Sequence, residues 1–366
     1  MCADVLPDRL STFKKFLDMR KIRVMPFDAS DKAMLVSLMK QKVDAVIDVL
    51  PTQFIALVAH AAIEAGVNLV NTNYAYGIRN LHEEVKNRGI AIVPECGLDP
   101  GIDLVIYHYG VQQFDEVHVL NSYCGGIPEK KACTNALNYK ISWNWDSVLK
   151  SQKREAVAVK DGKKITLSAE DQHDNALIHE IDFPGLGRLE AFPNGNAVFY
   201  TDLLGITPTL KETGRYSLRW PGWSSFWRIL KQFQFLSDEP LSGFPCEVTP
   251  HQFMVRLMEP QLQYKDDEKD LAVMKNVFIG KKDGRWKKLE MNLLIERDLE
   301  TGLMAMSMGV GYPASIVACM IASEEIKRKG VLSPAVDIPC GPFLKALAER
   351  GIVVQEETDS GGPRMP

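Results

Sequence analysis

The chain has 366 residues, of which 46% are apolar and 25% charged, and its formal net charge is −4. This is ordinary soluble composition, long enough for two domains or one elaborated domain. The net charge gives no basic field for nucleic acid or anionic lipid, so we expect neither as a partner. Apolar runs such as 56–63 are far too short to cross a bilayer, so we expect no membrane anchor.

Cysteine usage and the amino terminus favour a cytoplasmic enzyme. Seven cysteines, an odd number without regular spacing, argue against a disulfide framework. No CxxC or Cys/His cluster has the spacing of a zinc site, so we expect no metal. The first ten residues, MCADVLPDRL, form no basic apolar leader.

The first hundred residues predict alternating strands and helices. Helices are expected at 6–20, 31–41 with Ser30 as the cap, 53–65 and 78–88. Strands are expected at 22–26, 45–49, 67–71 and 90–94. Alternating units of this kind form a parallel, doubly wound sheet, so we expect an α/β fold with a Rossmann-like sheet.

One unit of that sheet is missing from the pattern. A dinucleotide-binding domain opens with a strand, a Gly-rich turn and a helix. Here residues 1–5 read like the end of the second strand, Asp4 stands at the place of the ribose-binding acid, and no GxGxxG is nearby. The sequence therefore predicts a sheet that lacks its first strand, Gly loop and helix, a unit of roughly 30 residues. A misassigned start codon would explain this, and we expect the unit in the frame upstream of Met1.

After Gly125 the pattern predicts an α+β substrate domain with a mixed sheet. Strands are expected at 138–145, 156–167, 179–183, 187–192 and 288–297, and helices at 223–235, 251–258, 313–329 and 343–351. Gly309-Val310-Gly311 precedes a helix, but it is typical of a tight turn between domains rather than of a phosphate loop. Only 357–366 looks like a loose tail.

These patterns predict two domains. Residues 1–115, with 309–366 returning, would bind the dinucleotide. Residues 116–308 would hold the substrate.

The stretch from 93 to 126 carries the strongest candidates for catalysis. Asp99 lies in a Gly-Leu-Asp-Pro-Gly turn after one strand, and Cys124 lies in Ser-Tyr-Cys-Gly-Gly at the end of the next. Because ligands bind outside the carboxyl ends of the strands in open α/β sheets, both side chains are expected at one crevice. Asp99 before Pro100 also fits a helix N-cap, and a lone Cys is often a buried structural thiol.

Three turns at strand ends predict a groove for a flat cofactor. They are Leu50-Pro51-Thr52, Thr72-Asn73-Tyr74-Ala75 and Gly97-Leu98-Asp99-Pro100. Their backbone groups would bond the nicotinamide carboxamide and the adjacent ribose, although any parallel sheet offers such loops.

Two arginines in GRYSLRWPGW are candidates to bind a substrate carboxylate. Arg215 and Arg219 are four residues apart, so in a strand both would point to one face. Arginine binds carboxylates through a two-pronged fork, although surface ion pairs are the alternative role. Trp143, in YKISWNWDS, would line the substrate pocket or belong to the core.

Three blocks of the sequence resemble the saccharopine dehydrogenases and the related lysine 6-dehydrogenases. They are GLDPGID at 97–103, SYCGGIPE at 122–129 with NYKISW at 138–143, and LEAFPN at 189–194 with GRYSLRWPG at 214–222. The resemblance covers essentially the whole chain and implies an NAD- or NADP-dependent oxidoreductase that acts on a carbon–nitrogen bond. Hydride would leave the carbon that bears the amine, and water would hydrolyse the resulting imine.

The resemblance also implies roles for individual residues. Asp99 and Cys124 match the family's acid and thiol near the reacting nitrogen. Cofactor contacts are implied at Asp4, Asp28, Ala29, Leu50, Pro51, Asn73, Leu98, Asp99, Pro100 and Ser142. Substrate contacts are implied at Tyr74, Ala75, Asp99, Trp143, Asn194, Ser217, Leu218 and Arg219. A homodimer through the second domain is a further implication.

Two departures from the family pattern bear on function. Saccharopine-cleaving members typically carry Arg-Asp-Ser after the Pro-Asn of LEAFPN, where this chain has Gly195-Asn196-Ala197. Losing that arginine favours a smaller amine such as lysine over saccharopine. The missing Gly loop raises the alternative of a truncated or catalytically silent member. A reductase that makes carboxylated polyamines is a third possibility. The acid at Asp4 favours NAD over NADP.

Overall fold

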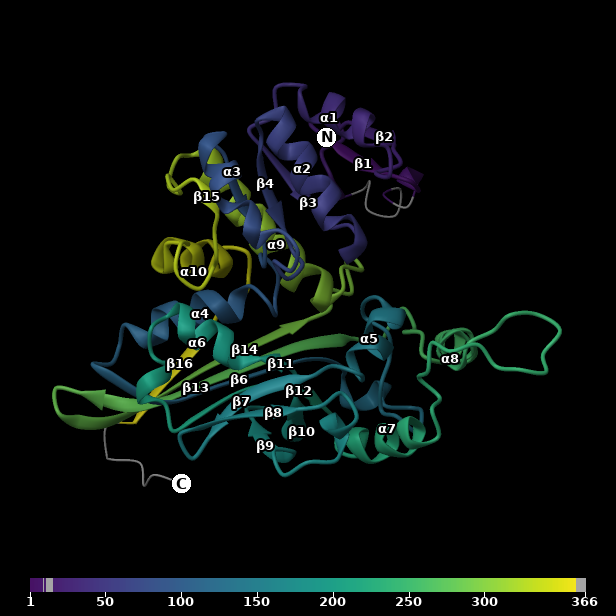
Figure 1. The fold of residues 1–366 in the computed structure, drawn as a ribbon, viewed down its shortest axis with the longest axis vertical. Coiled ribbons are helices and arrows are strands. Elements are labelled where there is room, and N and C mark those ends of the chain that lie inside the picture. The colour runs from purple at the N-terminus through teal and green to yellow at the C-terminus, as the bar shows by residue number, and fades with distance from the viewer. Residues whose placement is uncertain (9, 11–15, 360–366) are drawn as a thin grey trace.

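The computed structural model describes residues 1–8, 10 and 16–359. Figure 1 shows two sheets one above the other, with helices α4, α6 and α10 between them. The upper sheet is parallel and the lower sheet is mixed, as the sequence predicts.

The upper sheet has four parallel strands in the order β15-β5-β4-β3 within the described residues. They are β3 (Ala45–Asp48), β4 (Asn68–Asn71), β5 (Ala91–Val93) and β15 (Gly330–Val331). The helices packed around them are α1 (Lys32–Met39), α2 (Ile55–Ala65), α3 (His82–Asn87) and α9 (Ala305–Ala322). The cap of α1 is Asp31 rather than Ser30, because the Asp31 carboxylate accepts from the Met34 amide at 3.0 Å.

Strands β1 (Cys2–Asp4) and β2 (Val24–Pro26) form a separate parallel pair. A Rossmann sheet places its first strand between the second and the fourth. Here that position lies between β1 and β3, and no strand of the described residues fills it. This agrees with the sheet predicted to lack its first strand. The helix predicted at 6–20 falls largely outside the described residues.

The lower sheet has ten strands within the described residues, with the main order β11-β7-β12-β6-β13-β14-β16. Strands β10 and β8 pair with β12 and β7, and β9 pairs with β10. The strands are β6 (Glu116–Pro128), β7 (Ala156–Lys160), β8 (Lys163–Leu167), β9 (His179–Phe183), β10 (Gly187–Pro193), β11 (Gly195–Asn196), β12 (Glu212–Arg219), β13 (Asp270–Lys282), β14 (Arg285–Glu296) and β16 (Gln355–Asp359).

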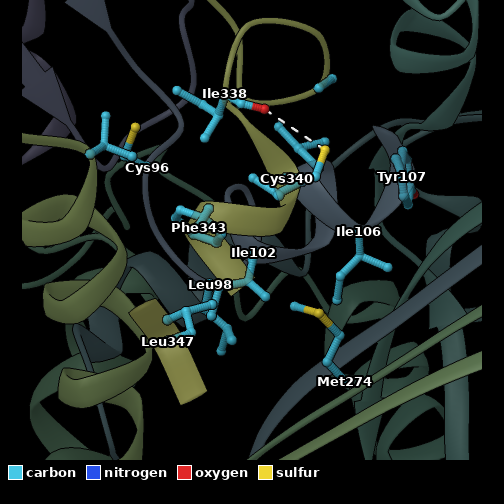
Figure 2. Close-up of a cluster of buried hydrophobic side chains, with 14 of the residues drawn as sticks. Cys96, Leu98, Ile102, Ile106, Tyr107, Met274, Ile338, Cys340, Phe343 and Leu347 are labelled. Carbon is cyan, nitrogen blue, oxygen red and sulfur yellow. Dashed lines mark hydrogen bonds between the residues drawn. The ribbon is translucent and has the colours of Figure 1, made fainter. Parts of the chain in front are cut away.

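The remaining helices lie on the lower sheet or join it to the upper one. They are α4 (Ile102–Val111), α5 (Trp145–Ser151), α6 (Ala197–Leu203), α7 (Trp223–Gln232), α8 (Pro250–Met258) and α10 (Cys340–Ala348). Figure 2 shows how α4 is fixed: Leu98, Ile102 and Ile106 gather with Phe343 and Leu347 of α10 in one buried cluster. This packing places the turn before α4 at the junction of the two sheets.

Several predicted elements differ from the structure. Residues 138–145 form no strand, because the Asn135 side chain binds the backbone of Leu137 and Tyr139 and Asn144 caps α5. Helix α9 begins at Ala305 rather than at 313, so Gly309-Val310-Gly311 lies inside a helix and is neither turn nor phosphate loop.

The carboxyl-terminal segment divides between the sheets. Strand β15 joins the upper sheet, whereas β16 pairs with β14 of the lower one. Residues 355–359 therefore do not return to the first domain, and 357–359 are not a loose tail. The other tail residues, 360–366, lie outside the described residues.

Helix α9 is also the one helix of the described residues that is long and apolar enough to cross a membrane, with a mean hydropathy of 1.5. Its Gly309, Pro313 and Val317 are buried, and the helix packs against strands of both sheets. These are the contacts of a core helix.

Candidate active site

The turn that carries Asp99 depends on Gly101. Gly101 has φ 152°, and a Cβ at this residue would lie 1.9 Å from the Gly97 carbonyl oxygen. Gly101 is the N-cap of α4, and the Asp103 carboxylate accepts from its amide at 2.7 Å. The N-cap role considered for Asp99 is therefore wrong, because Asp103 supplies the carboxylate at this helix end.

Asp99 instead forms an ion pair with Arg215, a contact that spans both sheets. The Arg215 guanidinium lies between two carboxylates: Nη2 contacts Asp99 Oδ1, and Nη1 lies 2.7 Å from Asp103 Oδ2. Burial opposes it, but Asp103 and Asp99 raise the pKa of Arg215 well above its usual range. Arg215 is thus neutralised within the protein and holds the Asp99 carboxylate in place.

Asp103 is completely buried, and its protonation is unusual for a carboxyl group. Burial raises the pKa of Asp103 to about 7, although the nearby Arg215 opposes this shift. Asp103 can therefore hold a proton near neutral pH.

Cys124 lies in the middle of β6 rather than at a strand end, and β6 belongs to the lower sheet. The prediction of a strand end was wrong because the strand continues through Gly125 and Gly126. Cys124 is 7% exposed, and burial raises the pKa of its thiol well above the ordinary value, with Asp99 and Asp103 adding to the shift. The thiol is therefore protonated at neutral pH, and Asp99 is close enough for its charge to act on it.

Arg219 is a buried guanidinium without a carboxylate partner among the described residues. It is 6% exposed and lies between the rings of Tyr139 and Trp223, at 5.3 and 5.0 Å. Its Nη1 donates to the Leu218 carbonyl at 2.7 Å, and its Nε has no partner. Burial lowers the pKa of Arg219. An uncompensated cation of this kind suits the carboxylate of a ligand.

Alternation along β12 places Arg215, Ser217 and Arg219 on one face, as the sequence predicts. Ser217 is aligned with Cys124 on β6. Leu218 points to the other face, where it packs in the apolar cluster with Tyr216. The predicted substrate contact at Leu218 stays a prediction, and its carbonyl accepts from Arg219 Nη1.

The turns after β3, β4 and β5 are linked by hydrogen bonds. The Asn73 side-chain Nδ2 donates to the Leu50 carbonyl at 2.9 Å, and the Glu95 backbone amide donates to the Asn73 backbone carbonyl at the same distance. Pro51 belongs to the first of these turns and is exposed. Leu98 and Pro100 of the third turn are buried, so only their backbone is available to a cofactor.

Glu95 is a second acid at this edge, which the sequence did not single out. It is fully buried with φ 63°, pairs with Arg79 at 2.8 Å and accepts from the Tyr200 hydroxyl at 3.1 Å. Its Oε1 also accepts from the Ala75 amide at 3.3 Å, so Ala75 offers no free amide to a substrate here.

Tyr74 lies between Asp99 and an arginine that the sequence analysis missed. Arg154 lies over the Tyr74 ring at 5.7 Å and donates to the Asn194 side chain at 3.0 Å. Both Asp99 and Arg154 act on the pKa of the Tyr74 hydroxyl, although burial is the main cause of its upward shift. No ion pair joins Arg154 to a carboxylate within the described residues. Its position between α5 and β7 carries no motif that would have revealed it.

The other predicted contacts lie in two places. Asp4 is the last residue of β1, and Asp28 and Ala29 follow β2. The carboxylates of Asp4 and Asp28 accept from the amides of Leu6 and Ser30. They belong to the separate two-stranded sheet. Ser142 and Trp143 line a pocket of about 360 Å³ between the 141–143 and 263–264 loops.

The residues present fit part of a dinucleotide. The linked turns at Leu50 and Asn73 offer polar groups, which suits the nicotinamide end. Ser142 Oγ is a buried hydroxyl without a partner in the described residues. Within the described residues no Gly-rich turn joins a strand to a helix at the place of a pyrophosphate. No group of three His, Cys, Asp or Glu in that part of the chain is arranged to hold a metal ion.

Individual relatives and solved structures resemble the chain over most of its length. It is 27% identical to the saccharopine dehydrogenase [NADP(+), L-glutamate-forming] of Saccharomyces cerevisiae, covering 92% of this chain and 89% of that enzyme. It is 26% identical to the mouse mitochondrial alpha-aminoadipic semialdehyde synthase, covering 89% of this chain but only 42% of that protein. The fold matches apo saccharopine dehydrogenase from Saccharomyces cerevisiae with a TM-score of 0.83 at 23% identity, over 98% and 93% of the two chains. A homospermidine synthase from Legionella pneumophila matches with a TM-score of 0.60 at 10% identity, over 94% and 83%.

Two family models account for nearly the whole chain. Residues 2–93 match the saccharopine dehydrogenase NADP binding domain, and residues 97–352 match the saccharopine dehydrogenase C-terminal domain. The second match spans more than half of the chain and includes Asp99, Cys124 and Arg219. The chain belongs to the saccharopine dehydrogenase family.

Proposed function

We propose that this chain is an NADP-dependent oxidoreductase that acts on the carbon–nitrogen bond of a secondary amine with carboxylates on both arms, as in saccharopine. The observation that carries the proposal is the pairing of Asp99 with Arg215 beside Cys124, at the junction of the two sheets. Asp99 belongs to the turn after β5, so its carboxylate lies at the edge of the upper sheet where the linked turns are.

The carboxylates of the substrate are inferred from the balance of charge around Asp99. Arg215 is neutralised by Asp99 and Asp103, whereas no described carboxylate pairs with Arg154 or Arg219. Arg154 adjoins Asn194, directly before the glycine at which family members carry an arginine. Two uncompensated guanidinium groups favour a substrate with at least two carboxylates over a monocarboxylate such as lysine.

The chemistry assigned to the chain's own residues is proton transfer and orientation. Leu50 and Asn73 would hold the nicotinamide end of the cofactor, which accepts the hydride. Asp99 takes the proton of the substrate amine and frees the nitrogen lone pair, so that hydride can leave the neighbouring carbon. Asp99 releases that proton to solvent and then takes a proton from the water that adds to the imine. It returns this proton to the nitrogen, the carbon–nitrogen bond breaks as the new hydroxyl gives up its proton to solvent, and the products are an aldehyde and a primary amine.

NADP is proposed as the cofactor because the matching domain model and the yeast relative carry it in their names. This opposes the preference for NAD inferred from Asp4. The Asp4 carboxylate already accepts from the Leu6 amide at 2.7 Å, so it has a local structural role that requires no ribose.

The test is a turnover assay of the full chain with saccharopine or lysine and NADP or NAD. The expected result is reduction of NADP with saccharopine, and a loss of about 10²–10⁴-fold in kcat in Asp99→Asn, with NADPH binding retained. The exposed Asp182 is the matched control, and Asp182→Asn should behave as wild type. Absent turnover together with absent NADPH binding would favour the catalytically silent alternative.

A further inference from the structure

The pocket at Ser142 lies next to β6, the strand that carries Cys124, but Asp99, Cys124 and Arg215 are not among the residues that line it. Its walls come from the 141–143 loop, the 263–264 loop, the residue after β14 and the residue before α9. A Cβ on Gly126, two residues beyond Cys124, would lie 3.0 Å from Ser142 Oγ. The pocket therefore lies beside Gly126 of β6, two residues from Cys124.

Three buried polar atoms in the lining have no hydrogen-bond partner within the described residues. They are the Ser142 hydroxyl, the Tyr264 hydroxyl and Nε of Arg297. A buried polar group without a partner costs about 1–3 kcal/mol, so three in one small pocket indicate a ligand that satisfies them. All three can donate a hydrogen bond.

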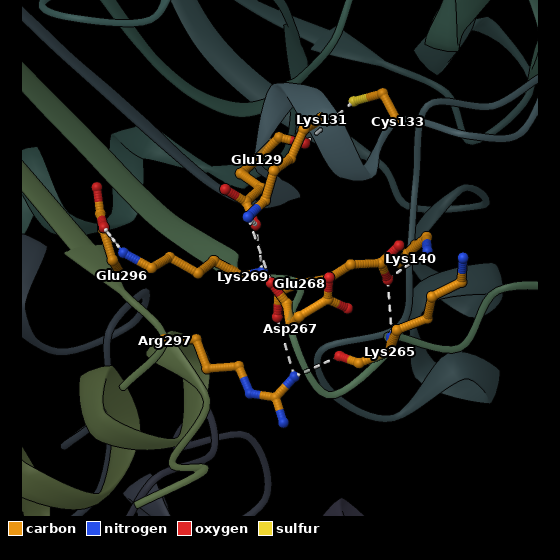
Figure 3. Close-up of polar contacts among 10 residues, drawn as sticks. All are labelled: Glu129, Lys131, Cys133, Lys140, Lys265, Asp267, Glu268, Lys269, Glu296 and Arg297. Carbon is orange, nitrogen blue, oxygen red and sulfur yellow. Dashed lines mark hydrogen bonds and ion pairs between the residues drawn. The ribbon is translucent and has the colours of Figure 1, made fainter. Parts of the chain in front are cut away.

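The orientation of Arg297 is fixed by the backbone, as Figure 3 shows. Its Nη1 donates to the carbonyls of Lys265 and Glu268, each at 2.9 Å. These two bonds fix the guanidinium through its Nη1 atom. Its Nε remains for a ligand in the pocket.

The acids nearest to Arg297 are already engaged. The Glu268 carboxylate pairs with Lys140 at 2.5 Å and accepts from the Lys265 amide at 2.7 Å. The Asp270 carboxylate accepts from the amides of Ala305 and Met306 at the start of α9, at 2.8 and 3.0 Å. The charge of Arg297 acts on Asp270, but no ion pair joins Arg297 to a carboxylate in the described residues.

We infer that Ser142, Tyr264 and Arg297 form a subsite for an anionic group, either a carboxylate or a phosphate. A fixed cation with two neutral donors beside it is the donor set that such oxygens require. The anionic group belongs either to the amine substrate, as a carboxylate, or to the dinucleotide, as a phosphate. Only this identification of the ligand rests on the proposed function.

The experiment uses Arg297→Gln and Tyr264→Phe in the full chain. The control is Arg188→Gln, which removes an exposed arginine paired with Glu180. The measurements are calorimetric titrations of NADPH and of glutarate, and the KM for saccharopine. Losing a charge-assisted hydrogen bond of about 1.5–3 kcal/mol corresponds to a loss of about ten- to hundredfold in affinity.

Weaker NADPH binding with an unchanged KM supports the phosphate, and a raised KM or weaker glutarate binding with unchanged NADPH affinity supports the carboxylate. Unchanged values of all three in a variant that melts like wild type would overturn the subsite. If Arg297→Gln fails to fold, Tyr264→Phe provides the same test, because it keeps the backbone contacts of Arg297. The expected change in affinity or KM is then a few-fold. A failure of the proposed function would appear instead as absent turnover in wild type, and the two titrations would still decide on the subsite.

Discussion

The seven cysteines lie in very different surroundings, and this bears on how Cys124 works. Cys124 is buried and close to two carboxylates, whereas Cys246 and Cys319 are exposed. Because the thiolate is the reactive form, a raised pKa makes the buried thiol inert as a nucleophile. Cys124 is therefore assigned the role of a protonated, non-nucleophilic thiol near Asp99.

We predict that iodoacetamide at neutral pH modifies Cys246 and Cys319 first and Cys124 much more slowly. Peptide mass spectrometry over a time course measures the order. Modification of Cys124 as fast as that of the exposed cysteines would show that its thiolate is accessible and would contradict this role.

The raised pKa of Asp103 predicts a pH dependence of stability. An acid whose folded pKa is about 7 and whose unfolded pKa is about 4 binds a proton in the native state between these values. The stabilisation is full below about pH 4 and is lost as pH rises to about 7. Relative to Asp103→Asn, wild type should lose up to about 1.4 kcal/mol per pH unit in this window.

Urea unfolding of both proteins from pH 4 to pH 8 measures the difference. Asp182→Asn, at an exposed site, should run parallel to wild type. Curves for wild type and Asp103→Asn that stay parallel over the whole range would show that Asp103 is ionised in the native state.

Arg154 predicts how the enzyme discriminates between substrates. Arg154→Gln should raise the KM for saccharopine by about tenfold, because one charge-assisted contact to a carboxylate is lost. Turnover of a monocarboxylate amine should change little. Steady-state kinetics with both substrates measure this, with Arg228→Gln as an exposed control. Equal effects on both substrates would assign Arg154 to the fold instead.

At the scale of elements, Arg215 joins β12 of the lower sheet to the start of α4. Arg215→Met would leave Asp99 and Asp103 without their shared partner, and such a broken buried pair costs about 3–5 kcal/mol. The loss of unfolding free energy, measured by urea titration, should be larger at pH 8 than at pH 5. Protonation of Asp103, whose pKa burial raises to about 7, relieves the repulsion at the lower pH. If Arg215→Met were as stable as wild type at pH 8, the stabilising role of these ion pairs would be contradicted.

The sequence predicted the strands of the upper sheet well, because each is a short apolar run that ends at a turn. It also predicted the shared face of Arg215 and Arg219, since alternation in a strand is regular. It missed the pairing of Arg215 with Asp103, because the two residues are 112 positions apart and only the packed fold brings them together.

Glycines and asparagines misled the prediction in the lower sheet. Gly125 looked like the end of a strand, but β6 continues, and a Cβ there would lie 2.3 Å from the Leu218 carbonyl oxygen. The glycine is needed for close strand packing. Strand β13 was missed because it is buried for most of its length, so its apolar residues show no clean alternation.

At the scale of the whole molecule, the two sheets bring Asp99, Cys124 and Arg215 to one place, although Cys124 and Arg215 belong to the lower sheet and Asp99 follows the upper one. The predicted absence of a first strand agrees with the interruption between β1 and β3. The homodimer and the cytoplasmic location stay predictions. The cofactor contacts of individual residues also stay predictions. They depend on how a dinucleotide lies across the turns of the β1-β2 pair and of the upper sheet.

The central claim is that hydride leaves the carbon next to a nitrogen at the Asp99 crevice. A single turnover with NADP and saccharopine deuterated at the carbon that becomes the aldehyde tests it most directly. The account predicts that the deuterium is found in the reduced nicotinamide with wild type and is nearly absent there with Asp99→Asn. Product formation by wild type without deuterium in the nicotinamide would contradict the account.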